Sequence, residues 1–407
     1  MKLPSSSNTF LFQLELKRKN TVHIVKSNIA GVVLLFILAL TVSAETVEHV
    51  VIERSGTKIH VEGRVIVEAQ DGGVLLLSND GQLWPIQSAE LKSREKEERK
   101  FKAMTQRETA KKLLEEMPEG FQIHTTAHYV ICYNTSSVYA QWCGSLYERL
   151  YRGFYGYWKY RGIELDEPEF PLVAVIFKDR GGYMQFSRPE LGESIESIIG
   201  YYNMRTNQVV MYDLTGADNI RPNQNIRSSN HINQILSQPG AERNVATIVH
   251  EATHQLAFNS GLQVRFADIP FWVSEGIAVY FETPDLSNPK GWRTIGGVNK
   301  TILLNFRNSL NNRPPNALEA LLSDDKRFRD PKQSAAAYAE AWALNYFLLK
   351  TREDDYVAYL ENMAKQMPLI ELGGEKRVAH FKQAFGNDLE ELDATFLKFM
   401  RRVSPRR

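Results

Sequence analysis

The spacing of apolar residues changes along this 407-residue chain, and the change limits the folds that it can adopt. Residues 46–90 alternate between apolar and polar positions in short runs, a period typical of half-buried β-strands. Groups that favour turns separate these runs, among them Ser55-Gly56 and Asn79-Asp80-Gly81. The pattern predicts five strands, at 49–54, 58–63, 64–69, 73–78 and 81–86. We therefore expect residues 45–90 to form a small β module, a barrel or meander of SH3-like type.

The chain changes character after this module. Residues 91–117 are dense in charge and favour helix, which predicts a solvated linker helix rather than a binding face. Residues 118–214 mix strand-like runs with a long helix that ends near Gly162, and residues 215–240 form a polar insertion rich in Asn, Ser and Gln. Residues 241–400 are mainly helical. Strands followed by helices in this way predict the α+β class.

Composition excludes several classes of protein. Hydrophobic residues make up 43% of the chain and charged residues 24%, so we expect a well-packed globular protein. The formal net charge of +1 gives no general attraction to nucleic acid, and we expect no nucleic-acid partner. The two cysteines, Cys132 and Cys143, are too few for a disulfide scaffold or a cysteine-rich zinc module.

The first 44 residues resemble an export signal. Basic residues from Lys17 to Lys26 precede the apolar run 29–42, and Ser43-Ala44 provides a small-residue exit. This order predicts a secretory signal cleaved after Ala44, with an uncleaved membrane tether through residues 29–42 or a misassigned start codon as alternatives. We therefore expect the periplasm, the cell envelope or the extracellular space. In an oxidising compartment the two cysteines either pair or stay as buried thiols.

The stretch "IVHEATHQLAFNSG" carries the strongest chemical signal in the chain. It lies in a predicted helix over 242–259, which Asn259-Ser260-Gly261 ends. Residues four apart share a helix face, so His250 and His254 can direct both imidazoles at one point, as Zn²⁺ requires. Glu251 lies about 100° around the helix, beside the ion, where it can take a proton from water. The alternative is a core helix with two incidental histidines.

A third ligand is expected on the next helix. In "DIPFWVSEGIAVYFETPD", Pro270 suits a first helical turn and Pro284 an end. Glu275 lies 21 residues after His254 among apolar neighbours, and a buried ionised glutamate is costly unless it is paired or bound to metal. Glu275 therefore completes a His₂Glu zinc set, whereas the plainer interpretation is an exposed glutamate on an amphipathic helix.

Together the two motifs, "HEATHQ" and "FWVSEGIAVYFE", resemble the gluzincin metallopeptidases of the peptidase MA-like clan, most closely the aminopeptidase N-type enzymes. The likeness is close around the motifs and looser from Phe121 onward, where the chain resembles uncharacterised bacterial peptidase-like proteins. The chain departs from the aminopeptidase pattern at Ser274, in place of Asn, and at Ile277, in place of Phe. It also lacks a Gly-x-Met-Glu-Asn element, so aminopeptidase specificity is not implied. The matching positions are His250, Glu251, His254, Gln255, Asn259, Trp272, Glu275, Gly276, Ala278, Tyr280 and Glu282.

The resemblance implies a zincin-like metallopeptidase domain, in which a mixed sheet and an active-site helix precede a helical C-terminal part. It also implies a tyrosine that stabilises the oxyanion, for which Tyr338 is the candidate, although an ordinary core tyrosine is the alternative. An edge strand that pairs with substrate is expected over 208–212, with Arg205 near its turn. Glu282 is expected to orient a ligand histidine if it faces the site.

The function expected from these features is an exported, zinc-dependent metallopeptidase that acts on a peptide or protein substrate. Glu251 is the expected general base, and the polar insertion at 215–240 is a candidate cover for the cleft. One alternative is a catalytically silent scaffold of the cell envelope that binds peptides on a peptidase-like fold. Another is zinc hydrolysis of a bond other than a peptide, which the same ligand set permits. Oligomeric state and endo- or exopeptidase preference carry no signal in the sequence.

Overall fold

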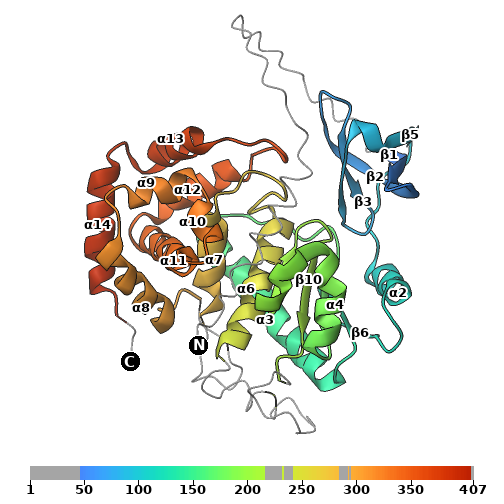
Figure 1. Ribbon diagram of the computed structural model, residues 1–407, viewed down its shortest axis with the longest axis horizontal. Coiled ribbons are helices and arrows are strands. Elements are labelled where there is room, and N and C mark those ends of the chain that lie inside the picture. Colours follow the sequence, from blue (N-terminus) through green and yellow to red (C-terminus); the bar gives the residue numbers. More distant parts are fainter. Residues whose placement is uncertain (1–45, 216–231, 233–241, 284–291, 293–294, 405–407) are drawn as a thin grey trace, which may run out of the picture.

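The computed structural model describes residues 46–215, 232, 242–283, 292 and 295–404 (Figure 1). The expected export segment at 1–44, most of the insertion at 215–240 and Pro284 lie outside the described residues. Two five-stranded sheets precede a helical C-terminal part, which confirms the α+β class. None of the described helices is both long and apolar enough to cross a membrane.

The first sheet is an antiparallel meander with the order β4-β3-β2-β1-β5. One face carries its own apolar cluster, which includes Val50, Ile52 and Leu76. The other face turns Leu75, Leu77 and other side chains toward Phe170 and Phe266 of the larger domain, so the module is packed against that domain. The strands are β1 (Val47–Arg54), β2 (Thr57–Glu68), β3 (Val74–Ser78), β4 (Leu83–Ile86) and β5 (Leu91–Glu97).

The structure corrects the expected organisation of residues 58–117. The two strands expected at 58–63 and 64–69 are one strand, β2, which continues through a register shift between Val65 and Val67. The linker helix expected over 91–117 is present only as α2 (Gln106–Glu116), because residues 91–97 form β5 and pair with β1. Arg94 in β5 forms ion pairs with Glu48 of β1 and Glu68 of β2. Arg94, which was expected on a solvated helix, therefore forms ion pairs with two other strands of the sheet.

The second sheet has parallel strands at its centre and antiparallel strands at both edges, in the order β6-β7-β8-β10-β9. Tyr201 donates to Ser187 of α4, whereas the ring of Tyr202 stacks on Phe258 of α6 (Glu242–Asn259), so α4 and α6 cover opposite faces. The elements are β6 (Gln122–Thr125), β7 (Tyr129–Tyr133), α3 (Ser137–Tyr160), β8 (Leu172–Phe177), α4 (Arg180–Leu191), β9 (Gly200–Asn203) and β10 (Gln208–Tyr212).

The expectation that residues 208–212 form the edge strand is wrong, because the neighbouring strand β9 has that position. Residues 208–212 form β10, which lies inside the sheet and pairs with β8 on one side and β9 on the other. The chain turns after Asn203, with Asn207 in the left-handed region (φ 62°). Among the described strands, β9 pairs with β10 alone and is the edge strand. A strand pair read from the sequence does not reveal which member pairs with a third strand, because that choice depends on β8.

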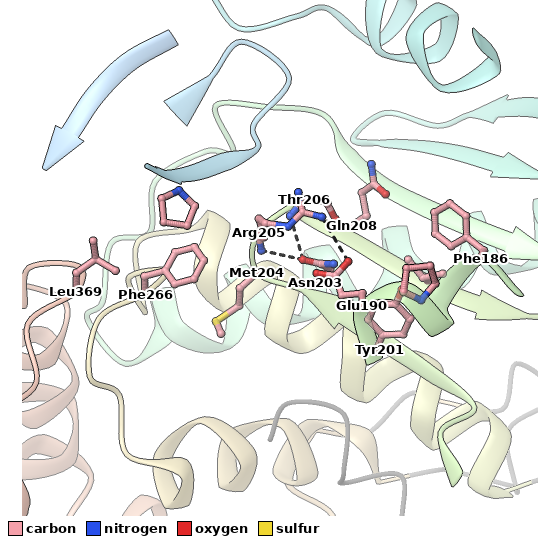
Figure 2. Close-up of a pocket in the computed structure, with 13 residues that line it drawn as sticks. Phe186, Glu190, Tyr201, Asn203, Met204, Arg205, Thr206, Gln208, Phe266 and Leu369 are labelled. Carbon is pink, nitrogen blue, oxygen red and sulfur yellow. Dashed lines mark hydrogen bonds and ion pairs between the residues drawn. The ribbon is translucent and has the colours of Figure 1, made fainter. Parts of the chain in front are cut away.

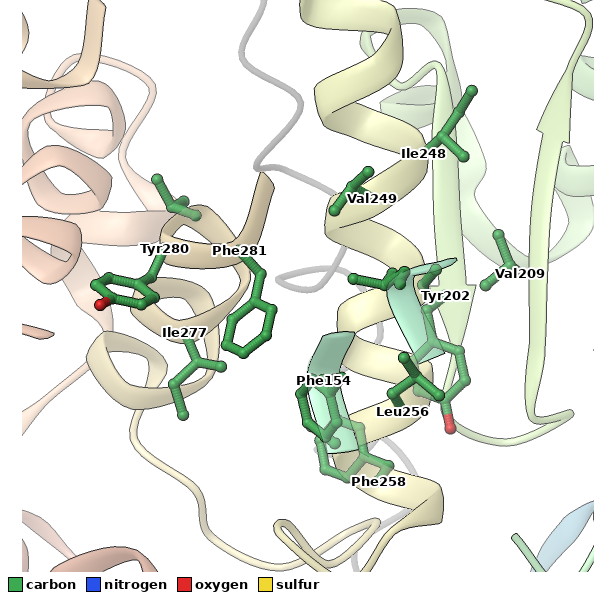
Figure 3. Close-up of a cluster of buried hydrophobic side chains, with 14 of the residues drawn as sticks. Phe154, Tyr202, Val209, Ile248, Val249, Leu256, Phe258, Ile277, Tyr280 and Phe281 are labelled. Atoms are coloured by element: carbon green, nitrogen blue, oxygen red, sulfur yellow. The ribbon is translucent and has the colours of Figure 1, made fainter. Parts of the chain in front are cut away.

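The helical part is built around α6 and α7. Figure 3 shows α6 between the sheet and α7, with Ile248 on the side of the sheet and Val249 on the side of Phe281. Every residue of α7 is buried, and Gly276 allows α11 to approach, since a Cβ there would lie 2.7 Å from the carbonyl oxygen of Ala341. The helices are α6 (Glu242–Asn259), α7 (Phe271–Glu282), α8 (Lys300–Ser309), α9 (Ala317–Ser323), α10 (Lys326–Arg329), α11 (Ser334–Thr351), α12 (Glu353–Met363), α13 (Gly374–Phe385) and α14 (Leu389–Arg402).

The two cysteines are free and buried, so the disulfide alternative is not found. Cys132 lies in β7 and Cys143 in α3. Burial raises the pKa of the Cys132 thiol to about 12, which keeps it protonated near neutral pH. Both thiols act as small apolar core groups.

Candidate metal centre

Three side chains from two helices converge inside the domain. His250 and His254 lie one turn apart on α6, and Glu275 faces them from α7. The Nε2 atoms of the two histidines are 3.1 Å apart. The carboxylate oxygens of Glu275 lie 3.2 Å from Nε2 of His250 and 3.6 Å from Nε2 of His254. The sequence-predicted ligand set is therefore brought together in space.

These separations fit one face of a tetrahedral metal site. Ligand atoms about 2.0–2.1 Å from a tetrahedral zinc ion lie about 3.3 Å from one another. The two Nε2 atoms are 3.1 Å apart, and the nearest Glu275 oxygen, a different one for each histidine, lies 3.2 Å and 3.6 Å away, so each distance is near this value. Taken as one atom per residue, the three ligand atoms all lie within 4.8 Å of one another. Three donor atoms on one face leave the fourth corner of the tetrahedron for water or substrate, as catalytic zinc sites do.

The outer nitrogen of each histidine is held by a hydrogen-bond partner. Nδ1 of His250 lies 2.6 Å from a carboxylate oxygen of Glu282, and Nδ1 of His254 lies 3.3 Å from the hydroxyl of Ser274. Ser274 donates its own proton to Gln263 at 3.0 Å, so its oxygen accepts from His254. With both Nδ1 atoms protonated, both Nε2 atoms direct lone pairs at the same point, an arrangement that a cation stabilises.

The charges of the site favour a cation. Burial opposes ionisation of Glu275, but the attraction of His254 and the hydrogen bonds with both histidines outweigh it and lower the pKa of Glu275. Burial lowers the pKa of His254, which favours the neutral imidazole that binds metal. For His250, burial is outweighed by the hydrogen bonds to Glu275 and Glu282, which raise its pKa. The carboxylates of Glu275 and Glu282 thus stabilise positive charge at the point where the ligand atoms meet.

Glu251 is positioned beside the ligand set by the edge of the sheet. The backbone N–H of Tyr202 in β9 donates to a carboxylate oxygen of Glu251 at 2.9 Å. Burial is the main reason that the pKa of Glu251 is raised to about 8. A carboxylate with a pKa in this range is suited to exchange protons near neutral pH.

Tyr338 also reaches the site. It lies in the second turn of α11 and is 2% exposed. Burial raises its pKa, as do the negative charges of Glu275 and Glu251 and a hydrogen bond to Glu275. The structure therefore brings Tyr338 next to the ligand set, where a phenol can donate a hydrogen bond.

Several contacts of the site were not expected from the sequence. In the sequence Ser274 is only a departure from the aminopeptidase pattern, yet it orients His254 together with Gln263. Tyr202 contributes only its backbone N–H, so no side-chain signal could have identified it. Glu282, in contrast, was expected to orient a ligand histidine and does contact His250.

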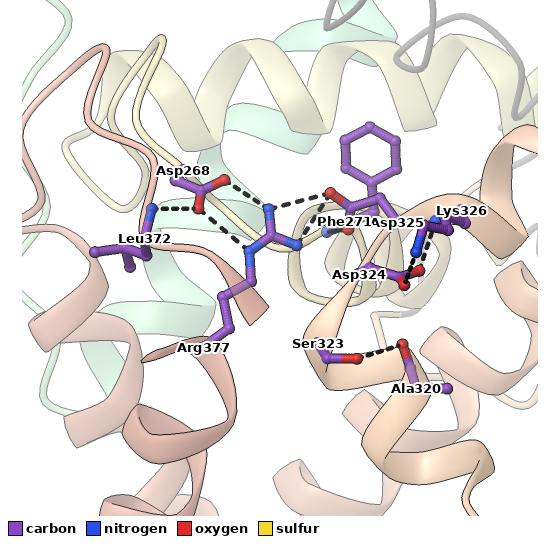
Figure 4. Close-up of polar contacts among 9 residues, drawn as sticks. All are labelled: Asp268, Phe271, Ala320, Ser323, Asp324, Asp325, Lys326, Leu372 and Arg377. Atoms are coloured by element: carbon purple, nitrogen blue, oxygen red, sulfur yellow. Dashed lines mark hydrogen bonds and ion pairs between the residues drawn. The ribbon is translucent and has the colours of Figure 1, made fainter. Parts of the chain in front are cut away.

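A buried ion-pair network holds the start of α7. The guanidinium of Arg377 binds Asp268 at 2.5 Å and Asp325 at 3.1 Å, and Asp325 accepts from the backbone N–H of Phe271, the first residue of α7 (Figure 4). Glu275 follows one turn later on the same helix. The network therefore sets the position from which Glu275 reaches the histidines.

Replacing Arg377 by Met is expected to lower the free energy of unfolding by about 3–5 kcal/mol, because it leaves two buried carboxylates without their cation. Urea denaturation measures the change. The matched control is Lys326→Met, which removes an ion pair with Asp324 whose lysine is 85% exposed and should cost less than about 1 kcal/mol. Equal losses in the two variants would contradict this role for Arg377.

Comparisons with known proteins add one limited likeness. A family described as "Protein of unknown function (DUF1570)" matches residues 244–370. This segment runs from α6 to the connection after α12, so it contains the three candidate ligands, Glu251 and Tyr338. No curated protein matches the chain.

Proposed function

We propose that the protein is a zinc-dependent metallopeptidase of gluzincin type, with a zincin-like domain and an SH3-like N-terminal module. The observation that carries the proposal is the convergence of two Nε2 atoms and one buried carboxylate, whose ligand atoms all lie within 4.8 Å of one another, the donor set of a catalytic zinc site. The edge strand β9 beside the general-base candidate Glu251 supports a peptide as substrate, because an extended chain can add to a sheet edge.

In the proposed reaction each residue has a separate task. Zinc held by His250, His254 and Glu275 would supply Lewis-acid polarisation of the scissile carbonyl and lower the pKa of the attacking water. Glu251 takes the proton from that water and passes it to the leaving amine. Glu282 and Ser274 keep the two imidazoles in the orientation that the ligand set needs.

Tyr338 is proposed to stabilise the oxyanion. Tyr338→Phe is then expected to lower kcat by about 10²–10³-fold, since one hydrogen-bond donor to the developing charge is lost. Steady-state kinetics of the zinc-loaded enzyme measure the effect on kcat, and the zinc affinity measures any effect on the metal site. If the variant binds zinc more weakly but keeps its kcat when loaded, Tyr338 acts through Glu275 and the oxyanion role is wrong.

The second candidate function is a scaffold that binds peptides without turnover. It is favoured by the burial of the centre, since His250, Glu251, His254 and Glu275 are each no more than 3% exposed. Closed sites are typical of structural metals, whereas catalytic sites keep a position open to substrate. The retained acid Glu251 favours the enzyme, because a binding protein needs no base at that point. Hydrolysis of a bond other than a peptide is a further outcome of the same test.

The deciding experiment combines metal analysis with a substrate screen. The purified protein is expected to contain about one zinc per chain and to cleave members of a mixed peptide library, with products identified by mass spectrometry. Folded protein without zinc would refute the metal centre. Zinc with no cleavage of the library, and none of ester or other amide substrates, would favour the scaffold.

We also propose that the chain is exported, on the basis of the basic lead and the apolar run at 29–42. The peptide or protein substrate would then be met in the periplasm, the cell envelope or the extracellular space. N-terminal sequencing of the exported protein is expected to begin at Glu45 after cleavage. An unprocessed N-terminus in the membrane fraction would indicate a tether instead.

A further inference from the structure

A cavity of about 430 Å³ lies where the edges of the two sheets meet (Figure 2). Pro85 of β4 forms one wall, and Tyr201 and Asn203 of β9 contribute to another. β4 and β9 are the edge strands of their sheets. The backbone N–H of Leu83 in β4 donates to the carbonyl of Arg205, in the turn after β9, at 2.8 Å and ties the module to that turn. The cavity is therefore a built feature of the interface between the module and the larger domain, a common location for binding sites.

Two bulky residues of the cavity wall have an unfavourable backbone conformation. Phe266 and Leu369 have φ values of 63° and 65°, in the left-handed region that large side chains rarely adopt. The backbone N–H of Leu369 donates to the carbonyl of Phe266 at 2.7 Å, so a hydrogen bond joins the two strained residues. Such strain costs about 1–3 kcal/mol per residue and is concentrated at ligand sites. The fold thus maintains two apolar side chains at this cavity against a backbone cost.

Strand β9 connects the cavity to the candidate metal centre. The backbone of Tyr202 contacts Glu251, and its neighbours on both sides, Tyr201 and Asn203, line the cavity. Consecutive residues of a strand are only about 3.3 Å apart. The cavity lies on the α4 face of β9 and Glu251 on the α6 face, so an extended peptide that adds to the edge of β9 would direct alternate side chains toward each.

The lining of the cavity is mostly apolar and includes one cationic side chain, that of Arg205. Its only charged lining residues among the described residues are Glu190 and Arg205, and they are joined by a single ion pair of 3.4 Å. The Arg205 side chain is 38% exposed. A guanidinium has five N–H donors, so this one contact leaves a fork that can bind a carboxylate through two hydrogen bonds. Most of the other lining residues are apolar, among them Phe186 and Phe266.

We propose that this cavity binds a segment of the peptide substrate in which a large apolar side chain and a carboxylate lie on the same side of the extended chain. Phe186 contacts the apolar side chain and Arg205 binds the carboxylate, whereas Phe266 and Leu369 line the other end of the cavity (Figure 2). The carboxylate belongs either to an acidic side chain or to the C-terminus of the peptide. The inference rests on the proposed function in taking a peptide as the occupant, and it names the feature by which that peptide is selected.

Peptide binding to the Glu251→Gln protein tests the proposal without turnover. Fluorescence anisotropy is measured with two pairs of labelled octapeptides: internal Leu-Ala-Asp against Leu-Ala-Asn, in which the two side chains share a face, and C-terminal Leu as the free acid against its amide. In at least one pair the carboxylate peptide is expected to bind at least about tenfold more tightly, because a charge-assisted hydrogen bond is lost in its twin. The pair that shows the difference identifies the source of the carboxylate.

A second substitution, added to the Glu251→Gln protein, tests whether the peptides bind in this cavity. Arg205→Met is expected to abolish the difference within the pair, and Arg205→Lys to retain part of it. Phe186→Ser, at a side chain that is already 37% exposed, should weaken all four peptides. The matched control is Arg188→Met, because Arg188 lies on α4 with Phe186 but does not line the cavity.

The outcomes separate this proposal from the proposed function. Equal binding within both pairs, or a difference that survives Arg205→Met, would overturn the cavity assignment even if the wild-type protein cleaves peptides. A difference that depends on Arg205 would support the assignment even if the wild-type protein lacks zinc and cleaves nothing, since binding needs neither.

Discussion

Glu251→Gln is expected to lower kcat/KM for peptide hydrolysis by about 10²–10⁴-fold, the usual contribution of a general base. The amide cannot take a proton from water, but it has the size of the carboxylate and can still accept the hydrogen bond from the Tyr202 backbone. The fold and the zinc content should therefore stay unchanged. Activity on a cleaved library peptide, together with zinc per chain, measures both.

The control for this result is the same substitution at an exposed glutamate. Glu361 lies on the surface of α12, and Glu361→Gln should leave kcat/KM unchanged. If Glu251→Gln retains more than a tenth of the wild-type activity with zinc bound, Glu251 is not the base. Loss of zinc in this variant would instead make Glu251 part of the metal site.

Glu275→Ala is expected to weaken zinc binding by more than about 100-fold, because the loss of a ligand should exceed the 10–100-fold effect of removing an orienting group. Chelator competition measures the affinity. Added zinc should also no longer raise the free energy of unfolding of the variant. In a protein that keeps its site, free zinc at about a thousand times Kd raises it by about 4 kcal/mol. Full zinc occupancy in the variant would refute the assignment of Glu275.

Two comparisons make this second prediction specific. Glu282→Gln removes the carboxylate that holds Nδ1 of His250 but leaves the three ligands, so its zinc affinity should fall by only about 10–100-fold. Circular dichroism of the metal-free proteins should show that Glu275→Ala remains folded. A similar loss of zinc in both variants would mean that Glu275 supports the site without binding the ion.

Local patterns predicted the helices of the site accurately. The expected helix over 242–259 has the same bounds in the structure, and α7 lies between Pro270 and Thr283, close to the expected range. These elements depend on side-chain period and end signals within a few turns of chain. The same reasoning failed for residues 91–97, where a charged strand is held by distant partners, Glu48 and Glu68.

The sequence by itself determined the donor types of the candidate centre and their placement on helix faces, because one helical turn brings His250 and His254 together. Only the tertiary structure decided that Glu275 reaches the same point, that Ser274 and Glu282 hold the outer nitrogens, and that β9 is the edge strand. It also created the cavity between β4 and β9. These features need contacts between segments far apart in the chain, and long-range packing leaves no local periodic signal.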